Sequence, residues 1–304
     1  MQICRFHLPH QGARVGAVQN GLIYDLTDRP GFGSVAEFAT ATAGLIPAQR
    51  VAVVAAALAQ PSNAVYDFAD LDRAPATDAP HLLAPIDQQE VWASGVTYLI
   101  SRDAREEESN QSNIYNRVYD APRPELFFKA TPNRVVGPRD YVYVRSDSTW
   151  SVPEPELTLF ISPRMDLVGF TIGNDVSSRS IEGENALYLP QAKVHRRCCA
   201  LGPAITLRES DNVPDPKNLN IRSVIYRGGQ PVFEGAINTS RIKRTLEELV
   251  LYLGRDQEYP HGVFLLTGTG IVPGSGFDLT EGDEVEITIG GLGVLRNPVR
   301  RCPA

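Results

Sequence analysis

The sequence PEPELTLFISPRMDLVGFTIGND, residues 153–175, contains two apolar runs separated by a short polar turn. Leu157–Ile161 and Leu167–Ile172 have the length and apolar character of buried strands, and the turn between them predicts an antiparallel hairpin. If the turn uses Pro163–Asp166, the register places Glu156 opposite residue 173 and Glu154 opposite residue 175.

The hairpin brings three carboxylates together. Glu154 and Glu156 are two residues apart in extended chain and therefore share one face, and the predicted register adds Asp175. Three like charges at this distance repel one another unless a cation neutralises them. Oxygen ligands favour Mg²⁺, or Mn²⁺, over Zn²⁺. The alternative is that the Glu-x-Glu pattern is an ordinary solvated strand face.

Outward from the hairpin, the chain divides into two predicted parts. Residues 86–304 contain many short β-like runs with frequent glycine and proline, and one amphipathic helix is predicted at 240–254, with Thr239 or Ser240 as its N-cap. Residues 1–85 predict a small β-meander, two alanine-rich helices near 34–43 and 47–60, and a connector at 61–85. We expect a catalytic domain at 86–304 and a small N-terminal domain at 1–85.

Composition excludes several classes of protein. The 304 residues carry 29 Lys and Arg against 36 Asp and Glu, a net charge of −7, which argues against nucleic acid or an anionic membrane as a partner. The longest apolar run, residues 51–59, is far shorter than the roughly 20 residues of a membrane-spanning helix. The first residues do not resemble an export signal. Four cysteines, without metal or disulfide spacing, predict free thiols in a reducing cytoplasm.

Several separate motifs resemble the fumarylacetoacetate hydrolase superfamily, in the order found there. They are EPEL at 154–157, GFTIGNDVSSR at 169–179, KVHRRCCALGP at 193–203, GTG at 268–270, LTEGDEV at 279–285 and GGLG at 290–293. The resemblance implies a mainly β fold of the mixed β-sandwich roll type, preceded by a small α+β domain. It also implies a Mg²⁺ site at Glu154, Glu156 and Asp175, a 2-oxo acid substrate, and a homodimer or homotetramer.

Within the superfamily, the chain is most similar to the 2-keto-3-deoxy sugar-acid dehydratases. This similarity is carried by WASGVTY at 92–98, SRDAR at 101–105, ELFFKATP at 125–132 and YLPQAK at 188–193. It implies dehydration of 2-keto-3-deoxy-D-pentonate to 2-oxoglutarate semialdehyde. The hydrolases of the superfamily use a histidine whose position falls near Ser101, and no histidine occurs between His81 and His195. Without that base, hydrolytic C–C cleavage lacks its water-activating group.

The resemblance also suggests roles for individual residues. Glu125 precedes an apolar run that would raise its pKa, so it is the candidate acid/base; an exposed charge at a strand start is the alternative. Lys193 would hold the enolate, or form a structural ion pair with Glu154 or Glu156, and the two roles are compatible. Thr269 would offer its hydroxyl to the substrate unless it only forms a tight turn.

A polar stretch at 101–124 predicts either a functional lid or a disordered loop. Ser101 and Arg102 lie at its base, where they would contact the substrate; a solvated lid charge is the alternative for Arg102. Two other functions remain open from the sequence. One is hydrolysis of acylpyruvates or diketo acids, with a lid pair in place of the missing histidine. The other is a sugar-acid binding protein without catalysis.

Overall fold

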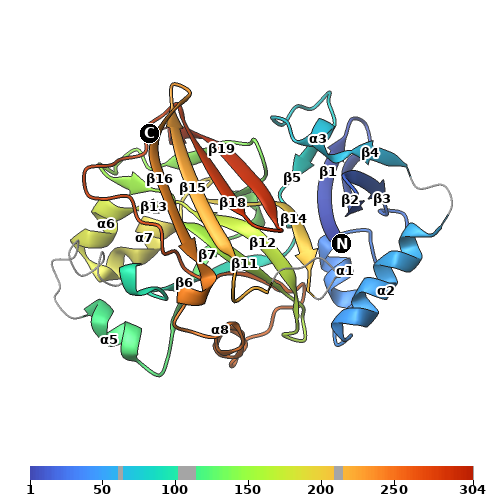
Figure 1. The fold of residues 1–304 in the computed structure, drawn as a ribbon, viewed down its shortest axis with the longest axis horizontal. Helices are drawn as coiled ribbons and strands as arrows, with labels where there is room; N and C mark the ends of the chain where they lie inside the picture. Colours follow the sequence, from blue (N-terminus) through green and yellow to red (C-terminus); the bar gives the residue numbers. More distant parts are fainter. Residues whose placement is uncertain (61–63, 102–113, 209–214, 304) are drawn as a thin grey trace.

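The computed structural model describes residues 1–60, 64–101, 114–208 and 215–303. The fold is mainly β, with 40% strand and 21% helix, as the sequence predicted. Figure 1 shows two parts side by side, with the N-terminal strands and helices on the right and the larger β-rich part on the left. None of the described helices combines the length and the apolar character needed to cross a bilayer.

A large twelve-stranded sheet runs through both parts. Its N-terminal strands, β1 (Gln2–Leu8), β2 (Gly12–Gln19) and β3 (Leu22–Asp25), form the predicted meander. β1 then pairs with β14 (Cys199–Leu207), which leads into the strands of the larger part. The other members of this sheet are β4 (Val65–Asp67), β5 (His81–Leu83), β6 (Glu90–Gly95), β7 (Glu125–Ala130), β8 (Val135–Val136), β11 (Pro155–Ile161), β12 (Leu167–Asp175) and β17 (Val263–Leu266).

A five-stranded sheet packs against the larger part of the first sheet. In spatial order it comprises β16 (Gln230–Asn238), β15 (Asn220–Arg227), β18 (Asp283–Ile289), β19 (Gly293–Arg301) and β9 (Val142–Val144). A two-stranded ladder joins β10 (Ser151–Val152) to β13 (Ser177–Ser178).

Short helices lie around the sheets. In the N-terminal part these are α1 (Val35–Ala41), α2 (Pro47–Leu58) and α3 (Phe68–Leu71). In the larger part they are α5 (Ile114–Asp120), α6 (Arg179–Glu184), α7 (Leu189–Lys193), α8 (Leu246–Leu253) and the 3₁₀ turns η1 (Pro132–Arg134), η2 (Ala186–Tyr188) and η3 (Thr239–Arg241). The predicted connector at 61–85 therefore contributes β4, α3 and β5, and β5 pairs with β1.

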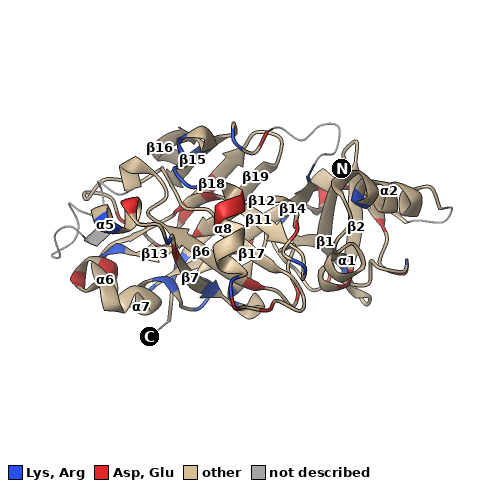
Figure 2. Cartoon of the chain, turned by 90° about the horizontal axis from the view of Figure 1, so that it is seen from below, with Lys and Arg blue, Asp and Glu red and all other residues tan. Residues whose placement is uncertain are grey.

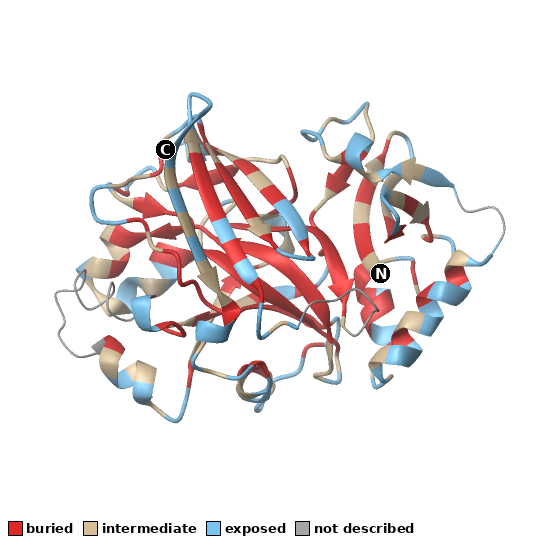
Figure 3. Ribbon diagram, viewed as in Figure 1, coloured by how far each residue is buried: buried red, intermediate tan, exposed pale blue. Residues whose placement is uncertain are grey.

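The alternation of side chains along β11 explains why this strand is buried on both faces. Leu157, Leu159 and Ile161 point into a core shared with the five-stranded sheet and α8. Phe160 points the other way, into a core shared with the N-terminal helices, where it stacks on Phe264 at 4.7 Å between ring centroids. In Figure 3 these central strands form a continuous buried layer. The apolar runs seen in the sequence thus form the middle of the molecule.

The hairpin has the predicted register. Glu156 pairs with Gly173, and a bulge at the turn end places Ile161 opposite Leu167. Beyond the paired residues, the amide of Asp175 donates to the carbonyl of Glu154 at 3.0 Å. The two carboxylate-bearing strand ends are therefore held together by backbone bonds.

The predicted start of the 240–254 helix is wrong. Residues 239–241 form the 3₁₀ turn η3, and α8 begins only at Leu246, where the Thr245 side chain accepts from the amide of Glu248. The backbone of 242–243 instead pairs with the segment that follows β6: Tyr98 bridges to Ile242, and the Lys243 amide donates to the Thr97 carbonyl at 2.9 Å. This tertiary pairing overrides the helical pattern of the sequence. The predicted end at Gly254 is correct.

Candidate metal centre and active site

Three carboxylates converge at the ends of β11 and β12. Glu154, Glu156 and Asp175 each offer an oxygen within 4.8 Å of the others, and each side chain is almost completely buried. The position of Glu154 is fixed from both sides, since its amide donates to the Asn174 side chain at 3.1 Å and its carbonyl accepts from Asp175. The cluster predicted from the hairpin register is therefore present.

Three cations surround two of these carboxylates. Lys193, at the end of α7, lies 2.5 Å from Glu154 Oε2 and 3.4 Å from Asp175 Oδ2, and donates to Ser177 at 2.7 Å. Arg179 Nη2 donates to Glu154 Oε1 at 2.9 Å. Lys129 forms an ion pair with Asp175 and donates to the carbonyls of Val176 and Lys193. Lys129 thus fixes both the Asp175 carboxylate and the backbone that carries Lys193.

The third carboxylate has a different environment. The Glu156 carboxylate accepts the Gly268 amide at 2.5 Å, and within the described residues no lysine or arginine lies at ion-pair distance from it. Burial, together with the charges of Asp175 and Glu154, raises the pKa of Glu156 well above its ordinary value. A cation bound directly against the Glu156 carboxylate would favour its ionised form. Three buried carboxylates that offer oxygen atoms close together suit Mg²⁺ or Mn²⁺, so the donor set fits a divalent metal.

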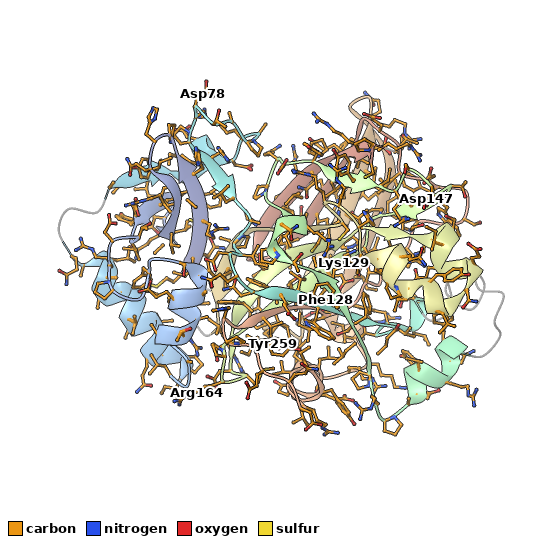
Figure 4. All side chains as sticks on the ribbon, turned by 180° about the vertical axis from the view of Figure 1, so that it is seen from behind. Asp78, Phe128, Lys129, Asp147, Arg164 and Tyr259 are labelled. Atoms are coloured by element: carbon orange, nitrogen blue, oxygen red, sulfur yellow. The ribbon has the colours of Figure 1, made fainter. Side chains whose placement is uncertain are left out.

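Lys129 illustrates how strongly this cluster is coupled. Its side chain is fully buried in β7 between Phe128 and Ala130. Burial opposes its charge, but the adjacent Asp175 more than offsets that cost, and the pKa of Lys129 is raised. Figure 4 shows Lys129 beside Phe128 among the strands of the larger part, whereas Asp147 lies at its outer edge. Lys129 is a structural cation of the metal centre.

A small pocket lies next to the three carboxylates. Its lining brings together the ends of β6, β7 and α7 with residues of α6 and of the loop after β17. The residues are Ser94, Gly95, Val96, Ser101, Glu125, Phe127, Glu154, Glu156, Glu182, Lys193 and Thr269. Figure 2 shows this region from below, where acidic segments of α6 lie near basic segments around α7 and β7. Most of the side chains that line the pocket are polar or charged, and Val96 and Phe127 are its apolar members.

Glu125 enters this pocket from the first residue of β7. It pairs with Gly95 on β6, and the side chain lies so close to that residue that a Cβ at position 95 would be 1.9 Å from Glu125 Oε2. The carboxylate is half-buried, so it is neither the fully exposed strand-start charge considered above nor a core residue. Gly95 provides the space that holds it in the pocket.

The structure places the other predicted residues as follows. Ser101 and Thr269 are buried and line the pocket, and the Thr269 hydroxyl also forms a turn with Ile271. The ion pair considered for Lys193 is present, with Glu154. Arg102 and the rest of residues 102–113 of the predicted lid lie outside the described residues, whereas Ile114–Asp120 of that stretch form α5. No histidine lines the pocket in the described part of the chain.

Sequence reasoning missed three residues of the site, namely Lys129, Arg179 and Glu182. A lysine inside the apolar run Leu126–Ala130 was a signal for Lys129, because an unpaired lysine is costly in a buried strand. Arg179 and Glu182 follow the Asp175 strand on a six-residue helix. Their spacing of three residues places them on one helical face, but a helix this short has too little periodicity to reveal that face.

Known proteins are similar to this chain over most of its length. The chain is 48% identical over 290 residues to the "Probable 2-keto-3-deoxyxylonate dehydratase" of Haloferax volcanii, covering 94% of this chain and 95% of that protein. It is also 48% identical over 221 residues to the 2-dehydro-3-deoxy-D-arabinonate dehydratase of Saccharolobus solfataricus, covering 71% and 74%.

A solved structure is similar over its whole length. It is a 2-keto-3-deoxy-D-arabinonate dehydratase complexed with magnesium and 2,5-dioxopentanoate, with a TM-score of 0.83, 36% identity and complete coverage of both chains. Residues 90–300 match the model of the fumarylacetoacetate (FAA) hydrolase C-terminal family. With this match and these relatives, the chain belongs to the fumarylacetoacetate hydrolase family.

Proposed function

We propose that the protein is a Mg²⁺-dependent hydro-lyase that converts a 2-keto-3-deoxy-D-pentonate to 2,5-dioxopentanoate, which is 2-oxoglutarate semialdehyde. The observation that carries the proposal is the pocket in which Glu125 and Lys193 lie beside Glu154 and Glu156, two of the three clustered carboxylates. Two dehydratases at 48% identity, and the similar structure holding magnesium and 2,5-dioxopentanoate, support the same reaction.

The metal would be held by Glu154, Glu156 and Asp175. When bound there, Mg²⁺ would supply Lewis-acid polarisation of the 2-keto group, which acidifies the protons at C3. The chain itself orients the three ligands through the backbone bond between Asp175 and Glu154 and through Lys129. These contacts keep the carboxylates in place before substrate arrives.

Proton transfer is assigned to Glu125. Dehydration breaks a C–H bond at C3 and the C–O bond at C4, and the departing hydroxyl takes a proton to leave as water. Glu125 is the pocket carboxylate outside the metal cluster that β7 and Gly95 hold in a defined position, so it is suited to remove or return a proton. Loss of water leaves a double bond between C3 and C4. C5 then loses a proton and C3 gains one, which gives an enol at C4 and C5. This enol takes a proton at C4 and gives up its C5 hydroxyl proton to become the aldehyde.

Lys193 binds substrate oxygen in this proposal. Its ammonium is buried and held by Glu154 and Ser177, so its remaining hydrogen-bonding capacity and its charge face the pocket. A fixed positive charge stabilises the enolate that develops when C3 loses a proton. Ser101 and Thr269 would donate hydroxyl hydrogen bonds to the substrate, and Arg102 would meet its carboxylate.

We further propose that the protein is a homodimer or homotetramer that works in the cytoplasm. The four cysteines are free thiols, three of them buried, which suits a reducing compartment. Light scattering coupled to size exclusion would measure the oligomer directly. A monomer at micromolar concentration would contradict that part of the proposal.

An NMR product assay tests the function. The purified protein with Mg²⁺ is given 2-keto-3-deoxy-D-arabinonate, its C4 epimer and one acylpyruvate, and we expect 2,5-dioxopentanoate from a pentonate and loss of activity with EDTA. Asp175→Asn should remove both Mg²⁺ binding and turnover. Pyruvate and a carboxylic acid formed from the acylpyruvate alone would identify a hydrolase. Binding of the pentonate without any product would identify a binding protein.

A further inference from the structure

We infer that Glu182 binds the terminal hydroxyl of the sugar acid, at C5, and thereby selects this substrate over 2-keto acids with an anionic tail. The inference rests on the proposed function and names a residue that determines its specificity. Glu182 lies on α6, and its side chain is 97% buried while lining the same pocket as Glu125 and Lys193.

The position of Glu182 is tied to the metal centre through one residue. Arg179 donates to Glu154 at 2.9 Å, and its Nε lies 3.9 Å from Glu182 Oε2, one helical turn away. The same guanidinium therefore sets the distance between a metal-ligating carboxylate and the Glu182 carboxylate. The Ser178 side chain, which accepts from the amide of Ile181, fixes the start of this helix. Glu182 is thus held at a defined place relative to the substrate's metal-binding end.

The substrate has a hydroxyl group at the end away from the metal, and this group needs a hydrogen-bond acceptor in the pocket. Its carboxylate and 2-keto oxygen occupy the metal end, and the C4 oxygen leaves as water and needs a proton donor. The C5 hydroxyl keeps its proton until the C5 aldehyde forms, so in the bound substrate it has a proton to donate. An ionised carboxylate only accepts hydrogen bonds, whereas Lys193 only donates them. Of the pocket's carboxylates, Glu154 and Glu156 belong to the metal centre and Glu125 to proton transfer, which leaves Glu182 for the C5 hydroxyl.

The charge of Glu182 adds a selection against other 2-keto acids. A dicarboxylate such as oxaloacetate places a negative charge where a pentonate carries neutral hydroxyl groups. In a buried pocket two like charges repel each other strongly, because little water separates them. A neutral tail that donates a hydrogen bond is favoured at the same position, so a single carboxylate both accepts the correct tail and excludes the wrong one.

The competing explanation is that Glu182 only supports Arg179. The two explanations differ in which substrates are affected. A supporting residue would change all substrates equally, since Arg179 acts on the metal centre that every 2-keto acid uses. A residue that contacts the C5 hydroxyl affects only substrates that carry it.

The experiment compares 2-keto-3-deoxy-D-pentonate with 4-hydroxy-2-oxopentanoate, which lacks only the C5 hydroxyl. We expect Glu182→Ala to lower kcat/KM for the pentonate by about 10- to 100-fold, the usual effect of losing a hydrogen bond to a charged group. For 4-hydroxy-2-oxopentanoate we expect a change of less than about threefold, since no such bond exists there. Glu184→Gln, on the exposed side of the same helix, is the matched control and should leave both values unchanged. An equal loss for both substrates would overturn the inference.

Glu182→Gln provides a second readout that retains the shape of the side chain. Because it removes the negative charge, we expect oxaloacetate to inhibit this variant at least about tenfold more tightly than the wild type, the factor for 1.4 kcal/mol of lost repulsion. An unchanged inhibition constant would overturn the selection by charge. The two proposals fail differently: if the wild-type protein makes no 2,5-dioxopentanoate, the proposed function is wrong, whereas an active wild type with substrate-independent losses contradicts only the role of Glu182.

Discussion

Glu125 is the residue on which the proposed chemistry depends most directly. Glu125→Gln keeps the size of the side chain and removes its ability to exchange a proton, so we expect kcat to fall by about 10²- to 10⁴-fold. Mg²⁺ binding should remain, because the residue lies outside the three metal-ligating carboxylates. Product formation measured by NMR tests the loss of turnover, and calorimetric titration with Mg²⁺ tests whether the metal still binds. Normal turnover in the variant would remove Glu125 from the mechanism.

Gly95 matters for the proposed chemistry because it leaves room for the Glu125 carboxylate. A methyl group at this position would overlap the Glu125 carboxylate, which is the movable end of a flexible side chain, so Gly95→Ala should displace the acid/base rather than unfold the strand. We expect a lower kcat with nearly unchanged thermal stability. Gly290→Ala is the matched control, since a Cβ there has no neighbour within 4 Å. Equal kcat values in the two variants would contradict the proposed packing of Glu125.

The raised pKa of Glu156 predicts how stability depends on pH. Between about 4.3, the ordinary pKa of an unfolded glutamate, and the raised value, the metal-free folded state keeps a proton that the unfolded chain has lost. The free energy of unfolding therefore falls as the pH rises through this window, by at most about 1.4 kcal/mol per pH unit from this group. Because Mg²⁺ binds the ionised form, its stabilising effect grows over the same range.

Thermal unfolding in EDTA and in Mg²⁺, at a series of pH values, measures both effects. The glutamine in Glu156→Gln cannot ionise. The free energy of unfolding of the metal-free variant should therefore fall less steeply with pH than that of the wild type, and Mg²⁺ should stabilise the variant only slightly. If wild type and variant have the same pH slope in EDTA, Glu156 is not the group that Mg²⁺ neutralises.

At the scale of single elements, the β11–β12 hairpin was predictable and α8 only in part. Apolar strands joined by a short turn have few alternative registers, so Glu156 was placed opposite Gly173 from the sequence alone. The start of α8 depends on Lys243 pairing with Thr97, a contact 146 residues away that no local pattern reveals. The role of Glu182 could not be predicted for the same reason, because α6 reaches the pocket beside β7 only in the folded chain.

Helix α8 offers a direct test of this difference. Thr245 accepts the amide of Glu248 and caps the observed helix, whereas Ser240 would cap the longer helix predicted from the sequence. We expect Thr245→Ala to lower the free energy of unfolding by about 1 kcal/mol. Ser240→Ala, at an exposed position outside the helix, should leave it nearly unchanged. Urea unfolding of both variants distinguishes the two helix starts. A larger loss of unfolding free energy in Ser240→Ala than in Thr245→Ala would favour the helix start predicted from the sequence.

At the scale of the whole molecule, we propose that residues 1–85 and 86–304 are two domains in sequence that unfold as one unit. β1 pairs with β14 through Gln2 and Ile3, so a single sheet crosses between the parts. One hydrophobic core also contains residues of both: Phe38 from α1 packs in the same cluster as Phe160 and Ile205. If one part unfolded alone, the strands and core side chains of the other part would lose the neighbours that bury them. We therefore expect the two parts to unfold together.

Phe38→Ala tests this coupling. The phenylalanine is completely buried, and its removal should cost about 3–5 kcal/mol. Both tryptophans, Trp92 and Trp150, lie in the larger part, so tryptophan fluorescence reports on that part alone. We expect Phe38→Ala to lower the midpoint of the fluorescence transition, whereas Val65→Ala, at an exposed position of the N-terminal part, should not. A fluorescence midpoint unaffected by Phe38→Ala would mean that the N-terminal part unfolds independently and does not stabilise the strands that carry the active site.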